Sequence, residues 1–201
     1  MKPMAKKEQW DIDPWNDTEM MKRVVGKVLP DPEDNEDQAR QIFYGQSGIR
    51  CLEIGAGYGR LLPYARKYFT ECVGIDWSVS LVARASLHLR HQFNCKVVLC
   101  DGVEIPYADS HFDFVYSFTC FQHMEDLEMI QQNLREAFRV LKRGGKIRIQ
   151  TVLGDRDDVG RYDGYVFKSV TEFGDQLEKV GFSNAITASI GEWIWSTGEK
   201  S

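Results

Sequence analysis

Three glycines at alternate positions mark the first place where this chain has the chemistry to bind a small molecule. Gly55, Gly57 and Gly59 follow a short apolar run that ends at Ile54. Glycine lets the backbone turn tightly, and a ligand can lie against it because no Cβ atom intrudes. The spacing is G-x-G-x-G, whereas the dinucleotide fingerprint is G-x-G-x-x-G and has glycine where this chain has Arg60. A tight strand–helix turn without a ligand is the alternative interpretation.

Acidic residues close three successive apolar runs, at Glu53, Asp76 and Asp101. In a doubly wound sheet, Asp76 would lie beside the glycine turn, where a carboxylate can accept two ribose hydroxyls and repels a 2′-phosphate. Asp101 can accept from an adenine amino group, while the next backbone N–H donates to the ring. The alternatives are a helix cap for Asp76 and a turn residue for Asp101. Ligands of open α/β sheets bind at the edge where such strand ends meet.

Strands and helices alternate from Arg50 onward, which favours a mostly parallel sheet covered on both faces. Strands are predicted at residues 50–54, 72–75, 97–99, 112–117, 146–152, 182–189 and 193–197, the last two joined by a turn at Gly191. Helices are predicted at residues 61–69, at 127–141 before a closing Gly144–Gly145 pair, and at 171–180 before Gly181. Another helix is predicted after a cap at Ser78, with Val79, Val82 and Ala83 facing the core.

Residues 1–48 precede this alternation and carry helical patterns of their own. Asn16 and Glu19 have capping-box spacing, and an apolar face follows at Met20, Met21, Val24, Val25 and Val28. Residues 31–37 are acidic and read as a loop or a helix start, and 39–44 as a short helix. Residues 49–201 supply a sheet with its own helices. We therefore predict one structural domain, with residues 49–201 as its main body and residues 1–48 as a helical lid over the carboxyl edge of the sheet. A helix fixed to the back of the sheet is the alternative.

Composition excludes several classes of protein. The 201 residues carry a net charge of −5, which argues against non-specific nucleic-acid binding. No apolar run has membrane-spanning length, and the N-terminus lacks a secretory apolar region. Five cysteines, an odd number, predict buried free thiols in a cytoplasmic protein. A zinc site at His88, His91, Cys95 and Cys100 is the alternative, but the two histidines fall in a helical pattern, so no metal is expected.

Residues 51–151 resemble the class I S-adenosylmethionine-dependent methyltransferases, especially the small group that includes ubiquinone and menaquinone C-methylases. Besides the glycine turn, the resemblance rests on the segments VGID at 73–76, CDGVEIPY at 100–107, FDFVYS at 112–117, FQHMED at 121–126 and LREAFRVLKRGG at 134–145. Arg143 replaces a proline usual in the family, and Gln122 stands where a histidine often occurs. The resemblance implies a Rossmann-like, doubly wound α/β fold. Its seven-stranded sheet has the order 3-2-1-4-5-7-6, with strand 7 antiparallel.

The resemblance also implies a cofactor, S-adenosylmethionine, with S-adenosylhomocysteine as product. Gly55, Ala56, Gly57 and Tyr58 would lie against its methionine part, and Glu53 would hold the amino group through water. Asp76 would bind the ribose hydroxyls, and Trp77 would flank the adenine. Asp101, with the backbone of Gly102 or Val103, would read the adenine edge, and Ser117 and Phe118 would line the sulfonium side.

Methyl transfer by in-line displacement requires chiefly that the reactants are aligned. His123 is a candidate base or substrate contact, with a loop histidine that caps the next helix as the alternative. Trp15, Tyr162 and Tyr165 are candidate substrate contacts, although packing of a surface loop is the preferred interpretation of the two tyrosines. A small-molecule acceptor is predicted first, and a protein or peptide side chain second. A non-catalytic cofactor-binding partner subunit and a nicotinamide dehydrogenase are further alternatives, the last disfavoured by the glycine spacing.

Overall fold

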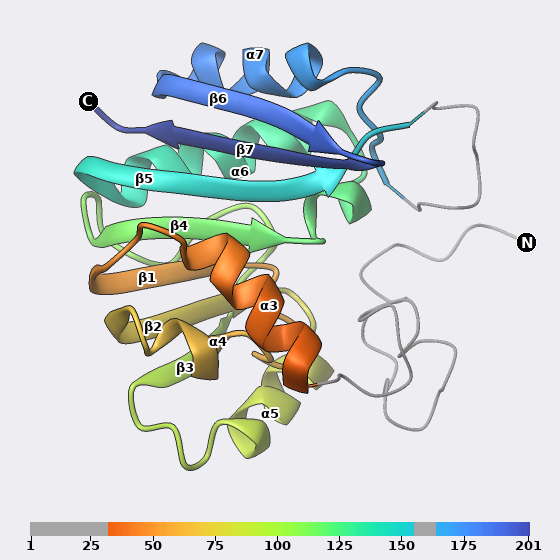
Figure 1. The fold of residues 1–201 in the computed structure, drawn as a ribbon. Helices are drawn as coiled ribbons and strands as arrows, with labels where there is room; N and C mark the ends of the chain where they lie inside the picture. Colours follow the sequence, from red (N-terminus) through yellow and green to blue (C-terminus); the bar gives the residue numbers. More distant parts are fainter. Residues whose placement is uncertain (1–31, 155–163) are drawn as a thin grey trace, which may run out of the picture.

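The computed structural model describes residues 32–154 and 164–201, which form one seven-stranded sheet (Figure 1). The strands are β1 Gly48–Ile54, β2 Phe69–Asp76, β3 Cys95–Leu99, β4 Phe112–Phe118, β5 Leu141–Val152, β6 Ser183–Ile190 and β7 Trp193–Glu199. Their order is β3-β2-β1-β4-β5-β7-β6, and β7 is antiparallel to both of its neighbours. The order and the antiparallel strand predicted from the resemblance are therefore confirmed.

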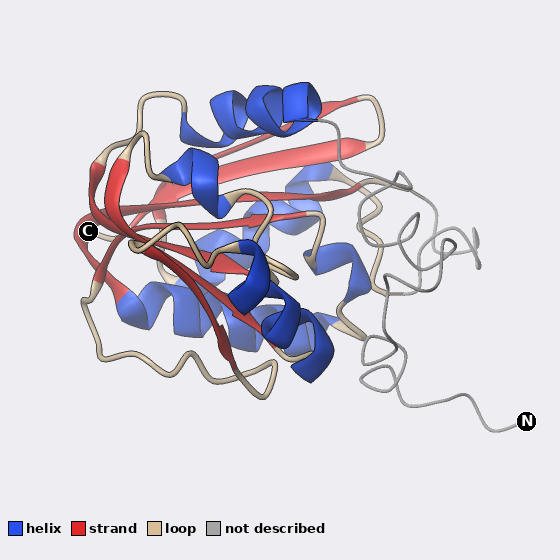
Figure 2. Ribbon diagram, turned by 90° about the horizontal axis from the view of Figure 1, so that it is seen from below, coloured by secondary structure: helices blue, strands red, loops and turns tan. Residues whose placement is uncertain are grey.

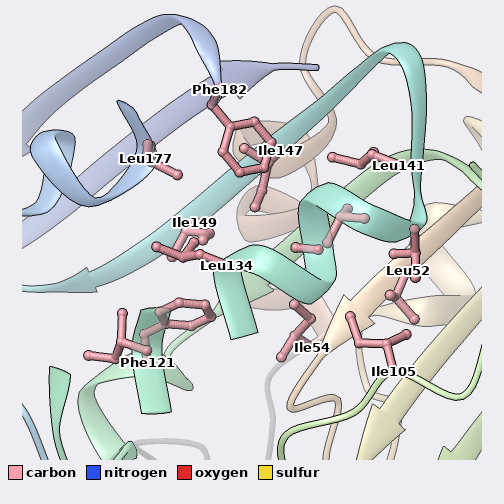
Figure 3. Packing of buried hydrophobic residues seen from close by; sticks show 14 of the residues in the cluster. Leu52, Ile54, Ile105, Phe121, Leu134, Leu141, Ile147, Ile149, Leu177 and Phe182 are labelled. Atoms are coloured by element: carbon pink, nitrogen blue, oxygen red, sulfur yellow. The ribbon is translucent and has the colours of Figure 1, made fainter. Parts of the chain in front are cut away.

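Helices lie on both sides of the sheet (Figure 2). They are α3 Pro32–Phe43, α4 Leu62–Ala65, α5 Val79–His88, α6 Leu127–Val140 and α7 Val170–Val180, with a short 3-10 helix, η1, at Phe121–His123. One face packs against α3, α4 and α5, and the other against α6 and α7. Each face carries its own cluster of buried apolar residues, the first beneath α3, α4 and α5 and the second beneath α6 and α7. Alternate residues of β1 point to opposite faces, so Cys51 belongs to the first cluster and Leu52 to the second. Figure 3 shows the second cluster, in which Leu134 of α6 lies among sheet residues such as Ile149.

Helix α5 presents a different face to the sheet from the predicted one. Its cap is as predicted, since Ser78 Oγ accepts the Leu81 N–H at 3.2 Å. The buried residues, however, are Leu81 and Ala85. Val79 is 56% exposed, Ala83 is exposed and Val82 is half-buried. The prediction for these three was wrong because Leu81, Ala85 and Leu89 repeat every four residues and form the stripe that contacts the sheet.

Two helix ends also differ from the prediction. Helix α4 is only four residues long, and β2 already begins at Phe69. Helix α6 ends at Val140, and Gly144 and Gly145 belong to β5 rather than closing the helix. The Gly144 N–H donates to the Lys200 carbonyl at 2.6 Å, and the Lys200 N–H donates to the Gly145 carbonyl at 2.9 Å. Pairing with the end of the chain thus makes the glycines strand residues.

Helix α3 is one continuous helix where the sequence indicated a loop or helix start followed by a short helix. Ala39, Ile42 and Phe43 are buried against the sheet. Arg148 of β5 donates to the carbonyls of Gln41 and Ile42 at 2.9 and 2.6 Å, which anchors the C-terminal end of the helix. The predicted lid helix with its apolar face, and Trp15, lie outside the described residues, so the lid and the boundary at residue 48 stay predictions.

All five cysteines are free thiols, as predicted, but Cys100 and Cys120 are only half-buried. Cys51, Cys72 and Cys95 stand in register on β1, β2 and β3 and are buried. Among residues 32–154 and 164–201, no cluster of three or more metal-ligating side chains has the geometry to hold an ion. None of the helices in the same residues is long and apolar enough to cross a membrane. The cytoplasmic location stays a prediction.

Candidate functional site

A pocket opens at the carboxyl ends of β1, β2 and β4, the edge that the three strand-end acids indicated. Its lining combines the glycine turn, the ends of the three strands and one side of α6. The lining residues are Glu53, Ile54, Gly55, Ala56, Gly57, Tyr58, Arg60, Ile75, Asp76, Trp77, Leu81, Cys100, Gly102, Phe118, Thr119, Cys120, His123, Met124, Met129 and Asn133.

The glycines of the turn have different tasks. Gly55 has φ of +72°, and a Cβ atom there would lie 2.2 Å from the Sγ atom of Cys120. Only glycine fits, because the chain packs directly against the segment after β4. Gly57 has φ of +56°, but a Cβ atom there would meet no atom within 4 Å. Gly57 therefore leaves an open space at the pocket wall, where a ligand can approach the backbone.

Asp76 fastens the turn to the end of β2. Its Oδ2 accepts the Gly57 N–H at 2.8 Å, and its Oδ1 accepts the Ser78 N–H at 2.9 Å. The carboxylate is only 7% exposed, yet it lines the pocket. A carboxylate oxygen can accept more than one hydrogen bond, so holding the backbone does not by itself prevent Asp76 from accepting ligand hydroxyls. Beside it, a Cβ atom on Gly102 would lie 2.8 Å from the Trp77 ring, so indole and glycine are closely packed.

Glu53 places a buried carboxyl group at the other end of the glycine turn. The Tyr116 hydroxyl donates to its Oε2 at 3.0 Å. Burial raises the pKa of Glu53 to about 8, although the positive charge of Arg60 acts in the opposite direction. Burial therefore favours the protonated form of this group. A cation entering the pocket would favour its ionised form.

Arg60 turns toward α3 and contributes to the pocket wall. Its Nη1 donates to the Asn35 Oδ1 and to the Gln38 Oε1, each at 2.6 Å. The guanidinium carbon lies 5.5 Å from the centroid of the Phe118 ring, within cation–π range. Burial lowers the pKa of Arg60, whereas Glu53 raises it. This residue therefore connects α3, the glycine turn and the end of β4.

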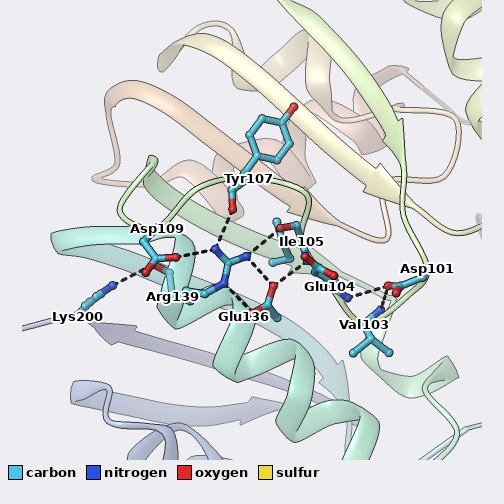
Figure 4. Close-up of polar contacts among 9 residues, drawn as sticks. All are labelled: Asp101, Val103, Glu104, Ile105, Tyr107, Asp109, Glu136, Arg139 and Lys200. Carbon is cyan, nitrogen blue, oxygen red and sulfur yellow. Dashed lines mark hydrogen bonds and ion pairs between the residues drawn. The ribbon is translucent and has the colours of Figure 1, made fainter.

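The loop after β3 brings Gly102, but neither Asp101 nor Val103, to the pocket lining. Asp101 Oδ1 accepts the N–H groups of Val103 and Glu104 at 2.9 and 2.8 Å (Figure 4). Asp101 thus makes the turn that was the alternative interpretation. Asn133 of α6 donates to the Gly102 carbonyl at 3.0 Å and holds this part of the loop over the pocket.

Helix α6 also fixes the remainder of this loop (Figure 4). The Ile105 N–H donates to Glu136 Oε2 at 2.9 Å. Arg139 donates to the carbonyls of Ile105 and Tyr107 at 2.9 and 2.8 Å, and to Asp109 Oδ1 at 2.8 Å. Glu136 accepts from the same guanidinium at 2.7 Å. The adenine side predicted from the sequence is thus shaped by two charged residues of a helix.

The segment after β4 supplies most of the remaining lining. Ser117 is buried and donates to the Ile54 carbonyl at 2.9 Å, so it joins β4 to β1 and does not line the pocket. Phe118 and His123 do line it, and their roles toward cofactor and acceptor stay predictions. Thr119, between them, has φ of +55°. A β-branched residue in that region is rare and strained, and such residues cluster at functional sites.

Of the three predicted substrate residues, only Tyr165 belongs to the described part of the chain. Its hydroxyl donates to Glu172 Oε1 at 2.7 Å, and its N–H donates to the Met124 carbonyl at 2.8 Å. The side chain packs beside Phe167 and is not among the lining residues. Trp15 and Tyr162 lie outside the described residues.

Comparisons with known proteins agree with this geometry. A family profile described as "Methyltransferase domain" matches residues 52–149. Phosphoethanolamine N-methyltransferase 2 of Caenorhabditis elegans is 29% identical over 153 residues, which are 71% of this chain and 34% of that protein. Malonyl-[acyl-carrier protein] O-methyltransferase 1 of Coxiella burnetii is 28% identical over 153 residues, 72% of this chain and 50% of that protein. This chain thus spans about a third to a half of these two relatives.

A solved structure shares the fold over nearly the whole chain. Haemonchus contortus phosphoethanolamine N-methyltransferase 2, solved with phosphomonomethylethanolamine and S-adenosylhomocysteine, has a TM-score of 0.78 at 17% identity. The similarity covers 99% of this chain and 61% of that one. Residues 52–149 belong to the methyltransferase-domain family, and the fold is that of the class I S-adenosylmethionine-dependent methyltransferases.

Sequence reasoning on this domain missed several pocket residues. Arg60 was noted only as a departure from the dinucleotide fingerprint. Met129 and Asn133 stand four residues apart on α6, a spacing that places both on one side of the helix. The amphipathic pattern of the helix does not show that these two residues lie near Gly102, so it could not place them at the pocket. The family match begins at residue 52, so it includes neither Asn35 nor Gln38.

Proposed function

We propose that this methyltransferase binds S-adenosylmethionine in the pocket and transfers its methyl group to a small-molecule acceptor. The observation that carries the proposal is the open space beside the Gly57 backbone, where a Cβ atom would meet no other atom within 4 Å. The Asp76 carboxylate lies next to this space, because it accepts the Gly57 N–H. In a chain of this family, that open backbone next to a hydroxyl-accepting carboxylate fits an adenosyl cofactor. The curated relatives are longer than this chain, so both activity and acceptor are part of the proposal.

The pocket residues divide into two ends in this proposal. Asp76, Trp77 and the Gly102 backbone would hold the adenosine end, where hydroxyls need acceptors and a base needs flat neighbours. Gly57 and Glu53 would hold the amino-acid end. The cofactor's sulfonium supplies an electrophilic methyl group, so the protein has mainly to align the acceptor with it and exclude water.

His123 is the proposed base or acceptor contact. It lines the pocket just after β4, and an imidazole can take a proton from an amine or hydroxyl acceptor near neutral pH. By their names, the nematode relatives act on phosphoethanolamine, which favours a small polar acceptor. The Coxiella burnetii relative is named for a substrate on a carrier protein. An acceptor attached to a protein is therefore the second candidate.

An acceptor screen tests the proposal. Small amines, hydroxyl compounds and carrier-bound acyl groups are offered with S-adenosylmethionine, and S-adenosylhomocysteine is measured as product. Calorimetry with S-adenosylhomocysteine and with NAD accompanies the screen. We expect binding of the first ligand only, and turnover with at least one acceptor that falls in His123→Ala while cofactor binding is retained. Binding of NAD without binding of S-adenosylhomocysteine would contradict the proposal. Cofactor binding without turnover of any acceptor would favour a regulatory subunit.

A further inference from the structure

The two edge strands of the sheet, β3 and β6, differ in how they discourage pairing with another chain (Figure 1). Strand β3 is five residues long and carries Lys96, whose Nζ atom lies 3.8 Å from Glu71 Oε1 and 5.9 Å from the centroid of the Tyr107 ring. A short strand and a lysine both protect an edge against further pairing. Strand β6 has eight residues, Ser183–Ile190, and contains neither a charged residue nor a proline. It therefore lacks the devices that protect β3.

The second half of β6 is a regular strand with a free outer side. The pairing of β6 with β7 shifts register between Ser183 and Ile186, where Asn184 has φ of +51°. From Ile186 to Ile190 the pairing with β7 is uninterrupted, and within residues 32–154 and 164–201 β6 pairs with no other strand. At the edge of a sheet, alternate backbone N–H and C=O groups point away from the neighbouring strand. This stretch of five residues thus offers those outward groups to a further strand.

The face of β6 that is turned away from α7 is apolar. Thr187 faces α7, because a Cβ atom on Gly174 of that helix would lie 3.2 Å from Thr187 Oγ1. Ile186, Ala188 and Ile190 alternate with Thr187 and therefore face the other way. All three are exposed, and the exposed fractions of the two isoleucines are 69% and 70%. Large apolar side chains at an unprotected edge are the features of a pairing surface.

This stretch is self-complementary about a two-fold axis. When two copies of β6 pair antiparallel with Ala188 opposite Ala188 of the second copy, Ile186 lies opposite Ile190, and Ile190 opposite Ile186. Both contacts lie on the apolar face. Trp195 and Trp193 of β7 stand in register beside Ala188 and Ile190, so they extend this face within each copy.

Neither a different register nor a charged partner matches the strand as well. An axis one residue away, at Thr187, would place Ile190 opposite Asn184 and lose the contact between isoleucines. An acidic or basic segment would find no counter-charge on β6, because the strand carries none. A second copy of the same neutral strand meets no like charge there. Charge and side-chain pattern therefore favour a second copy of this chain as the occupant.

We propose that two copies of this chain associate through β6, with Ala188 at the two-fold axis and Ile186 packed against Ile190 of the second copy. The two sheets then form one continuous sheet with the two β6 strands at its centre. Because the interface is small, the association is weak and depends on concentration. It is independent of the proposed function, since no residue of the pocket lining belongs to β6 or β7.

Sedimentation equilibrium of the whole chain measures this association. We expect the average mass to rise from one chain toward two between about 1 µM and 1 mM, the affinity range of a small interface. Ile186→Lys and Ile190→Lys should each weaken association at least about ten-fold, because every dimer contains the substituted contact twice and each ammonium loses water there. Both isoleucines are mainly exposed in a single copy, so the fold should be retained. Leu87→Lys, at a 60% exposed position on α5, is the matched control and should leave association unchanged.

Cysteine cross-linking tests the position of the axis. Directly opposite residues of an antiparallel pair have Cα atoms about 4.5–5.5 Å apart, a distance that a disulfide can bridge. Ala188→Cys should therefore give disulfide-linked pairs of chains under mild copper-catalysed oxidation by air. Ser189→Cys is an exposed neighbour that would lie opposite Thr187, so it should cross-link much more slowly. The unmodified protein, with its own five cysteines, is the second control.

Each outcome decides the proposal. Concentration-dependent association that both isoleucine variants weaken, together with faster cross-linking of Ala188→Cys than of Ser189→Cys, supports it. The mass of a single chain throughout the concentration range overturns it. Association that the isoleucine variants leave unchanged places the interface elsewhere and also overturns it. Equal cross-linking of Ala188→Cys and Ser189→Cys contradicts the pairing of the two β6 strands about Ala188.

Discussion

The Oδ2 atom of Asp76 accepts the Gly57 N–H at 2.8 Å, which ties the glycine turn after β1 to the end of β2. The pocket rim is therefore shaped by the protein itself before a ligand arrives. A preorganised acceptor binds hydroxyls without an ordering cost. The same carboxylate consequently has a structural and a ligand-binding task, and substitutions should affect both.

Asp76→Ala should weaken S-adenosylhomocysteine about ten-fold or more and lower the free energy of unfolding by about 1–3 kcal/mol. Both effects follow because the substitution leaves the N–H groups of Gly57 and Ser78 without their acceptor. Calorimetry and urea unfolding measure the two quantities. Glu71→Ala, on the same strand but in half-exposed ion pairs, should cost at most about 1 kcal/mol and leave binding unchanged. An unchanged dissociation constant in Asp76→Ala would contradict its assigned role.

Alanine at Gly55 and alanine at Gly57 should separate folding from binding. Gly55→Ala places a Cβ atom against Cys120 in a left-handed conformation, so it should cost roughly 2–5 kcal/mol of stability. Gly57→Ala has the same backbone strain without the clash and should cost only about 1–2 kcal/mol. Its Cβ atom enters the pocket, so cofactor affinity should fall about ten-fold or more, at least 1.4 kcal/mol. Equal stability of the two variants would argue against this division of tasks.

Strand-end residues were predictable from sequence because apolar runs locate strands, and parallel strands align their carboxyl ends at one edge. That reasoning found Glu53 and Asp76, and the family resemblance supplied the strand order. Periodicity does not state where a long side chain goes, so the turn of Arg60 toward α3 was missed. Nor does it show which of two adjacent stripes meets the sheet, as α5 demonstrates. Gly144 became a strand residue only through pairing with Lys200, a partner distant in sequence.

Arg139→Met should loosen the loop after β3 without unfolding the domain. Its guanidinium holds the carbonyls of Ile105 and Tyr107, and methionine keeps the length of the side chain without donors. Hydrogen exchange should rise in residues 101–109, and cofactor affinity should fall several-fold because Gly102 belongs to this loop. Arg135→Met, on the same helix but bonded only to Gln131 within the described residues, is the matched control and should change neither. Unaltered exchange in the loop would show that Arg139 does not hold it.

Glu53 should make the stability of the ligand-free protein depend on pH. Its pKa in the folded state is about 8, against an ordinary value of 4.5, because burial disfavours the charged form. Above pH 4.5 the unfolded chain releases this proton while the folded protein keeps it. The contribution of Glu53 to stability is therefore complete below about pH 4.5 and is lost progressively as pH rises to about 8.

Glu53→Gln should remove that dependence, since glutamine resembles the protonated acid and does not titrate. Near pH 5 the variant and the unmodified protein should differ by no more than about 1.5 kcal/mol, the net value of one hydrogen bond. Near pH 8 the variant should be the more stable of the two. In the unmodified protein, ionisation of Glu53 in the unfolded chain then lowers the free energy of unfolding, and glutamine has no such ionisation. Urea unfolding at several pH values measures this crossing, and Glu71→Gln, a half-exposed acid on β2, should show none. Parallel stability curves for Glu53→Gln and the unmodified protein would mean that Glu53 is already ionised in the empty pocket.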